Sequence, residues 1–172
     1  WSGDSLGFKL FKTTAGQKNV LNNNSIACLL PDPSEPGKRL WIGTKGGGIN
    51  CLDLRTGDMK YITTDQGLPN NVVYGMLPDA SGRLWCSTNR GIFRLTMQGE
   101  KVADVKVFTQ ADGLQNNEFN TQAFFKTAGG EMLFGGVDGL NRFSPELLEL
   151  NNTPPPVRIV GIEINHQPAR FS

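Results

Sequence analysis

The strongest constraint on the fold is that the chain repeats itself. Residues 21–32, "LNNNSIACLLPD", align without a gap to residues 68–79, "LPNNVVYGMLPD". Residues 84–95, "LWCSTNRGIFRL", align in the same way to residues 132–143, "MLFGGVDGLNRF", and they also overlay residues 1–11. The period is roughly 45 residues, a length typical of units that stack side by side. We therefore expect several copies of one supersecondary unit.

Each repeat reads as four short strands joined by tight turns. In the second repeat the expected strands are residues 72–77, 83–87, 92–96 and 105–109. The first is apolar on both faces, as in a strand buried on both sides, and the last is more polar. Glycine recurs at one place in the turn before the third strand, where a positive φ is expected: Gly7, Gly48, Gly91 and Gly139.

Four strands per repeat, graded from apolar to polar, are the pattern of a β-propeller blade. Leucine-rich repeats are much shorter, and helical repeats need an apolar period of 3.6 that is absent here. We predict an all-β chain that forms a partial β-propeller of about three four-stranded blades plus the tail of another. On this prediction "DQGLPNN" (residues 65–71) leads from the outer strand of one blade to the inner strand of the next, and it lies on the same face as the "TNRG" turn (residues 88–91).

Composition excludes several classes of protein. Lys plus Arg number 17 against 16 for Asp plus Glu, which gives no electrostatic basis for binding nucleic acid. The longest apolar runs are too short to cross a bilayer. The cysteines, Cys28, Cys51 and Cys86, lie within expected strands without a CxxC motif, so buried free thiols are favoured over a disulfide or zinc framework. The chain opens on Trp1, which we interpret as the start of an excised fragment.

Three stretches carry a family resemblance: "LWIGTKGGGINCLD", "DQGLPNNVVYGMLPDASGRLWCSTNRGIFRL" and "FGGVDGLNRFSP". They resemble the two-component regulator propeller repeats found in the periplasmic sensor region of Bacteroides-type hybrid two-component systems. The third repeat looks like the terminal blade of that family. "NNTPPPVRIVGIEINHQP" resembles the linker and first strand of the immunoglobulin-like domain that follows the propeller there.

The resemblance implies a parent with two propellers, an immunoglobulin-like module, one transmembrane helix and a cytoplasmic histidine kinase. Such a parent senses oligosaccharides, controls polysaccharide-utilisation genes and is expected to form a homodimer. The fragment itself is expected to lack a cofactor and a metal site, and to self-associate through the open ends of its incomplete ring.

The resulting domain boundaries are as follows: residues 1–11, tail of a preceding blade; 12–57, a blade; 58–103, a blade; 104–150, the terminal blade; and 151–172, a Pro-rich linker and the first strand of the immunoglobulin-like domain.

The turns "DQGLPNN" and "TNRG" and their counterparts lie on the face where β-propellers usually bind ligands, and they supply the candidate binding residues. Asn pairs recur there, and they cap turns by bonding to nearby backbone or else present amides to sugar hydroxyls. Nearly equivalent turns also carry side chains that vary between repeats. The candidate ligand-binding residues are Lys45, Asn70, Asn71, Arg90, Asn116, Asn117 and Asp138.

Two further features have alternative interpretations. Trp41 and Trp85 lie in second strands, where packing between blades is favoured over a platform for stacking sugars. Glu118, Asn120 and Gln122 alternate along the expected inner strand of the terminal blade, which places them on one face. They either bond to backbone and water or line part of a polar pocket.

No catalytic residue is predicted. His166 is the one histidine, without a Ser, Cys or ligand partner at a recognisable spacing. "GTKGGGI" lies between two expected strands, so it does not fit a phosphate-binding loop. The alternatives to a sensor are a propeller lyase or glycosidase with its catalytic residues outside this fragment, and an interaction scaffold of the WD-repeat type, whose Gly-His and Trp-Asp pairs are absent.

Overall fold

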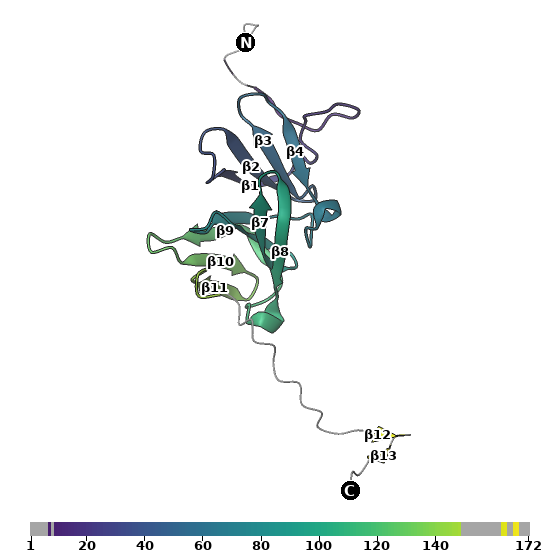
Figure 1. Ribbon diagram of the computed structural model, residues 1–172, viewed down its shortest axis with the longest axis vertical. Helices are drawn as coiled ribbons and strands as arrows, with labels where there is room; N and C mark the ends of the chain where they lie inside the picture. The colour runs from purple at the N-terminus through teal and green to yellow at the C-terminus, as the bar shows by residue number, and fades with distance from the viewer. Residues whose placement is uncertain (1–6, 8, 149–162, 165–166, 169–172) are drawn as a thin grey trace.

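The computed structural model describes residues 7, 9–148, 163–164 and 167–168, and strands make up its regular structure almost entirely (Figure 1). The strands of the first sheet are β1 (Ile26–Pro31), β2 (Arg39–Thr44), β3 (Ile49–Asp53) and β4 (Met59–Ile62). Those of the second are β5 (Gly75–Pro78), β6 (Leu84–Thr88), β7 (Gly91–Gln98) and β8 (Lys101–Phe108). Those of the third are β9 (Phe119–Lys126), β10 (Met132–Gly136) and β11 (Gly139–Phe143).

Within each sheet every strand pairs antiparallel with the next strand along the chain. The innermost strands β1, β5 and β9 contact one another, so the three sheets radiate from a shared centre (Figure 1). This is the arrangement of propeller blades. The all-β class and the partial propeller are therefore confirmed.

The apolar core lies between neighbouring sheets. One cluster lies between the first and second sheets and includes Trp41, Ile49 and Phe93. Another lies between the second and third sheets and includes Trp85 and Phe134. Trp85 lies against Phe108 at a ring-centroid distance of 5.2 Å and against Phe143 at 5.0 Å. Burial of Trp41 and Trp85 between blades is thus confirmed.

The passage between blades has the same structure both times it is described. A short 3₁₀ turn, Thr64–Gln66, follows β4, and another, Gln110–Asp112, follows β8. Each is followed by a glycine with positive φ, 97° at Gly67 and 99° at Gly113. The prediction that "DQGLPNN" connects an outer strand to the next inner strand is confirmed.

The inner strand of the second blade begins later than its apolar run predicts. β5 starts at Gly75, whereas the expected strand started at Val72. Val72 instead forms a bridge with Lys45, and the Val73 N–H donates to the Thr44 carbonyl at 2.8 Å. The first residues of the run therefore tie the second blade to the first before the chain enters its own sheet.

The terminal blade differs from the expected four-stranded unit. In the described part of the chain its sheet has three strands, and residues 144–148, which include Pro145, form a turn. Asn120 and Gln122 are both exposed, whereas Glu118 precedes β9 and accepts a hydrogen bond from Tyr74 Oη at 3.2 Å. Gln122 has a φ of 64°, and the register with β10 shifts between Phe134 and Gly136. The expected regular alternation is therefore interrupted by a bulge, and these side chains do not form a buried polar row.

The ends of the chain bear only in part on the expected boundaries. Of residues 1–11, those described lie outside any strand, and the rest fall outside the described residues. The linker at 151–162 and His166 also fall outside them, while β12 (Glu163–Ile164) and β13 (Gln167–Pro168) pair antiparallel. The expected boundary between residues 103 and 104 falls inside β8. The sheets therefore agree with the strands expected from the repeat, but the expected boundary between residues 103 and 104 does not lie between two sheets.

Candidate functional site

The candidate binding residues lie along one connected row of turns. The Gly46 N–H, next to Lys45, donates to the Asn71 carbonyl at 3.0 Å. The Asn70 side chain donates to Asn89, the neighbour of Arg90. The row continues through the remaining predicted residues, since the Gly91 N–H donates to the Asn117 carbonyl at 2.7 Å and Asn116 Nδ2 to Asp138 Oδ2 at 2.6 Å. We call Lys45, Asn70, Asn71, Arg90, Asn116, Asn117 and Asp138 the turn row.

The asparagine amides of the turn row are occupied by the turns themselves. Asn71 Oδ1 accepts from the Thr64 N–H at 2.9 Å, and Asn117 Oδ1 accepts from the Gln110 N–H at 2.8 Å. Asn70 Oδ1 accepts from the Val72 N–H at 3.0 Å. These are local caps of the kind that Asn makes in turns. The geometry favours the structural interpretation of the Asn pairs that the sequence left open.

The two cations of the turn row, unlike the asparagines, do not use their side chains to hold the turns. Lys45 and Arg90 are exposed, and in the described part of the chain neither side chain makes a hydrogen bond or an ion pair. Each extends from a turn whose backbone is fixed by its neighbours, such as the Arg90 N–H, which donates to Thr88 Oγ1 at 2.8 Å. These side chains are thus available to a ligand at this face.

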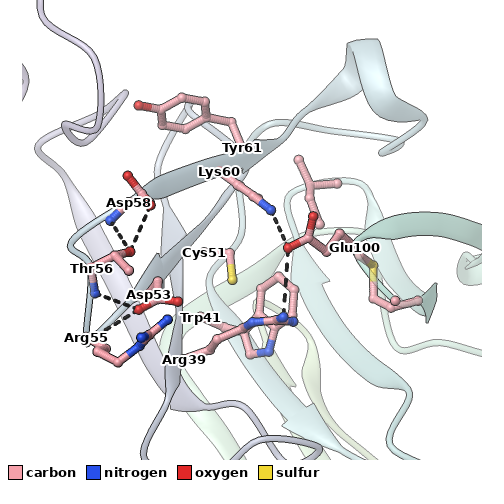
Figure 2. Close-up of a pocket in the computed structure, with 13 residues that line it drawn as sticks. Arg39, Trp41, Cys51, Asp53, Arg55, Thr56, Asp58, Lys60, Tyr61 and Glu100 are labelled. Carbon is pink, nitrogen blue, oxygen red and sulfur yellow. Dashed lines mark hydrogen bonds and ion pairs between the residues drawn. The ribbon is translucent and has the colours of Figure 1, made fainter.

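A separate cavity of about 290 Å³ lies where the first blade meets the second, near the opposite ends of the strands (Figure 2). Its walls come from β2–β4, the turn after β3 and the turn between β7 and β8. The residues that give it its chemistry are Arg39, Trp41, Asp53, Lys60, Tyr61 and Glu100. Its volume is at the lower end of the range of small-molecule sites.

Glu100 bridges two cations in this cavity. Its carboxylate pairs with Lys60 and lies 3.9 Å from the guanidinium of Arg39 (Figure 2). The hydrogen bond and charge of Lys60 lower the pKa of Glu100. Arg39 also pairs with Glu35 at 2.9 Å. The cavity therefore brings the hydrogen-bond donors Arg39 and Lys60 of the first blade together with the carboxylate of Glu100 from the second blade.

Trp41 is the unusual member of the lining. Its side chain is 5% exposed, and its Nε1 has no acceptor among the described residues. The equivalent Trp85 donates from Nε1 to Asp79 Oδ2 at 3.0 Å, and Arg83 Nε donates to the same oxygen at 2.6 Å. An unsatisfied buried donor is rare in native proteins and calls for an explanation.

The difference between the two tryptophans accompanies a difference in turn length. Arg39 follows Asp32 by seven positions, whereas Arg83 follows Asp79 by four. In the longer turn the Asp32 carboxylate accepts from the N–H and the hydroxyl of Ser34, at 2.9 and 2.6 Å. Sequence reasoning missed this cavity; the longer spacing between Asp32 and Arg39 is the signal that could have indicated it.

The three thiols are buried and free, as predicted. Burial raises the pKa of Cys28 to about 12 and, outweighing nearby charges, that of Cys51 to about 11. Burial also raises the pKa of Cys86 well above its ordinary value. Such thiols are poor nucleophiles at neutral pH, so Cys51 serves as part of the cavity wall rather than as a reactive group.

Among the described residues, no group of three or more His, Cys, Asp and Glu side chains is arranged to hold a metal ion. In the same part of the chain, no helix has the length and apolar character needed to cross a membrane.

Three sheets around shared inner strands define the class of protein as a β-propeller, of which this chain forms a part. Residues 67–90 match the family model described as the two component regulator propeller. The resemblance of the repeats to that family is thereby confirmed. The matched segment runs through Asn70, Asn71 and Arg90 of the turn row.

Known proteins resemble the chain in sequence or in fold. Over 124 residues it is 28% identical to histidine kinase P4 of Formosa agariphila, covering 72% of this chain and 9% of that protein. It also resembles the extracellular domain of the hybrid two-component system BT3049 of B. thetaiotaomicron, with a TM-score of 0.68 and 20% identity over 81% of this chain. The corresponding domain of BT4673 gives a TM-score of 0.61 at 20% identity over 80% of this chain. This chain covers 18% and 19% of those two structures.

Proposed function

We propose that the chain is part of the periplasmic sensor region of a hybrid two-component system. In this role it contributes to binding of a glycan-derived ligand and relays the signal to a cytoplasmic histidine kinase that controls polysaccharide-utilisation genes. The parent acts as a homodimer, and the remaining blades and the immunoglobulin-like domain complete its sensor region. The chain itself carries no catalytic step in this proposal.

The observation that carries the proposal is the family match at residues 67–90, because that segment builds the middle of the turn row. Backbone hydrogen bonds between successive blades fix the backbone of these turns, so their side chains extend from defined Cα positions. A rigid scaffold that presents variable side chains from turns is a common way to build a binding site. Lys45 and Arg90 are the members best placed to contact sugar hydroxyls or acidic groups.

The test uses the intact parent protein in membranes, with kinase autophosphorylation measured against a panel of enzymatically digested polysaccharides. Lys45→Ala and Arg90→Ala are expected to weaken the response to the active digest by about tenfold for the pair, with the unfolding midpoint unchanged. Lys101→Ala is the matched control, because Lys101 is also exposed but starts β8, away from the turn row. An unchanged response in the double variant would rule out this face.

A propeller lyase or glycosidase is the competing function, and it is separable by a direct measurement. The purified chain is expected to produce no new reducing ends or unsaturated products from any polysaccharide in the panel. If the chain cleaves a polysaccharide and one substitution in this chain abolishes that cleavage, the sensor proposal is wrong and the chain is a lyase or glycosidase.

A further inference from the structure

The cavity between the first two blades brings together side chains that donate hydrogen bonds. Arg39 and Lys60 line it from the first blade, and the indole N–H of Trp41 is buried in its wall with no acceptor in the described chain. Arg55 also lines it, and no ion pair involving Arg55 occurs among the described residues. Such a set of donors is complementary to a group that only accepts hydrogen bonds.

The carboxylates of the cavity are not equivalent. Asp53 Oδ1 accepts from the N–H groups of Arg55 and Thr56, both at 2.8 Å, so it caps the turn after β3. Asp58 accepts from Thr56 Oγ1 and from Asn19 Nδ2, at 2.8 and 2.7 Å. Both carboxylates are therefore committed to holding the first blade together (Figure 2).

Glu100 is the exception. It lies in the turn between β7 and β8, its side chain is 57% exposed, and in the described structure its contacts are with the cations Lys60 and Arg39. A half-exposed ion pair contributes little to stability, so little free energy opposes its replacement. Removal of this one carboxylate would leave Lys60 without its ion-pair partner, beside a Trp41 N–H that has no acceptor among the described residues. Arg39 would keep its ion pair with Glu35 at 2.9 Å and lie 3.9 Å from Asp32, so it is held in place beside the vacated position.

We propose that this cavity is a binding site for an organic carboxylate, which replaces Glu100 on Lys60 and Arg39 and accepts a hydrogen bond from Trp41 Nε1. Glu100 acts as the internal occupant of the site when no ligand is bound. This site is distinct from the turn row, and it does not depend on the sensor function proposed above. Because both blades contribute groups to it, its occupancy changes a contact between them.

The experiment titrates the 172-residue chain with D-glucuronate, with acetate and with D-glucose, and follows the indole N–H signals of Trp41 and Trp85 by NMR. Glucuronate is expected to shift the Trp41 signal saturably, and glucose to leave it unchanged. Trp85 is an internal control, because its N–H is already bonded to Asp79. A saturable shift with acetate also supports the proposal, since it assigns recognition to the carboxylate alone.

Matched variants test the replacement of Glu100. Glu100→Gln is expected to lower the Kd for glucuronate up to about fivefold, and Lys60→Met to raise it by a similar factor, as an exposed ion pair allows. Glu131→Gln is the control, because Glu131 pairs with Arg142 on the third blade, outside the cavity. The absence of a saturable Trp41 shift, an equal shift with glucose, or the same Kd in the wild type and Glu100→Gln would each overturn the proposal.

Discussion

At the scale of single residues, the two repeats place equivalent tryptophans in different bonding situations. Trp85 donates to Asp79 and packs between Phe108 and Phe143, whereas Trp41 is almost as well buried without an acceptor. A hydrogen bond to a charged group contributes about 1.5–3 kcal/mol, and an unsatisfied buried donor lowers stability by about 1–3 kcal/mol. The same side chain therefore stabilises one blade more than the other.

This difference predicts unequal effects of the same substitution. Trp85→Phe is expected to lower the free energy of unfolding by about 2–3 kcal/mol, since it removes a hydrogen bond and part of a packed ring. Trp41→Phe is expected to lower it by about 1 kcal/mol or less, because no hydrogen bond is lost. Urea unfolding of both variants measures the difference, and equal losses would contradict the assignment of bonding partners.

Asp79 makes the stability of the second blade depend on pH. Burial alone would raise the pKa of Asp79, but hydrogen bonds from Trp85 and Arg83 outweigh it, so the pKa lies below its ordinary value. A carboxylate with a lowered folded pKa adds stability above its unfolded pKa of about 3.9, and that stability is lost as the pH falls through the folded pKa. The urea midpoint of the wild type should fall below about pH 4 more steeply than that of Asp79→Asn. Parallel curves would exclude this role for Asp79.

At the scale of strands and turns, one glycine position recurs with the backbone conformation that the alignment required. The φ angles are 74° at Gly7, 68° at Gly48, 97° at Gly91 and 116° at Gly139. A side chain at Gly91 would also contact the carbonyl oxygen of Phe108, where β8 ends. Glycine is therefore needed there both for its φ and for the close approach of the outer strand.

The two requirements can be separated with a second glycine. Gly82 has a φ of 77°, but a Cβ added there meets nothing within 4 Å. Gly82→Ala is expected to cost about 1–2 kcal/mol from backbone strain alone. Gly91→Ala is expected to cost about 3 kcal/mol or more, because the contact with β8 adds to the strain. Denaturant unfolding measures both losses. A Gly91→Ala variant as stable as Gly82→Ala would show that β8 moves away from the added methyl group at no cost in stability.

At the scale of the whole molecule, both ends of the blade arc present apolar side chains. On the first sheet Leu29 is 59% exposed beside a hollow lined by Ile26 and Leu40, and on the third sheet Phe125 is 62% exposed and Leu140 58% exposed. Only part of each end strand is exposed, because Ala27 and Cys28 in β1 are buried and Phe124 in β9 is half-buried. Faces of this kind in a soluble chain favour association.

We accordingly expect the chain to self-associate at micromolar concentration. Leu29→Lys and Phe125→Lys should each shift the molar mass measured by light scattering towards the monomer, because a charge would be buried at the contact. Val137→Lys is the control, since Val137 is 56% exposed but lies in the turn between β10 and β11. A monomeric wild-type chain would show that a partial ring is stable in solution without covering its exposed apolar faces, and would contradict this expectation.

The sequence by itself determined the features that depend on neighbouring residues. Alternation and apolar runs indicated the strands, recurring glycines indicated turns with positive φ, and the Asn-containing phrases indicated the passages between blades. Burial of the tryptophans and cysteines followed from their places within strands. These features could be predicted because strand period and turn chemistry depend on neighbouring residues and recur in every repeat.

The tertiary structure alone decided which side chains meet across blades. It showed that the Asn amides cap turns, that Gln122 interrupts an expected strand, and that Glu100 from the second blade reaches Lys60 of the first. It also showed that a turn three positions longer, seven positions from Asp32 to Arg39 against four from Asp79 to Arg83, accompanies a Trp41 without an acceptor. Such contacts join residues far apart in the chain, so they depend on the packing of whole sheets, which no local pattern specifies.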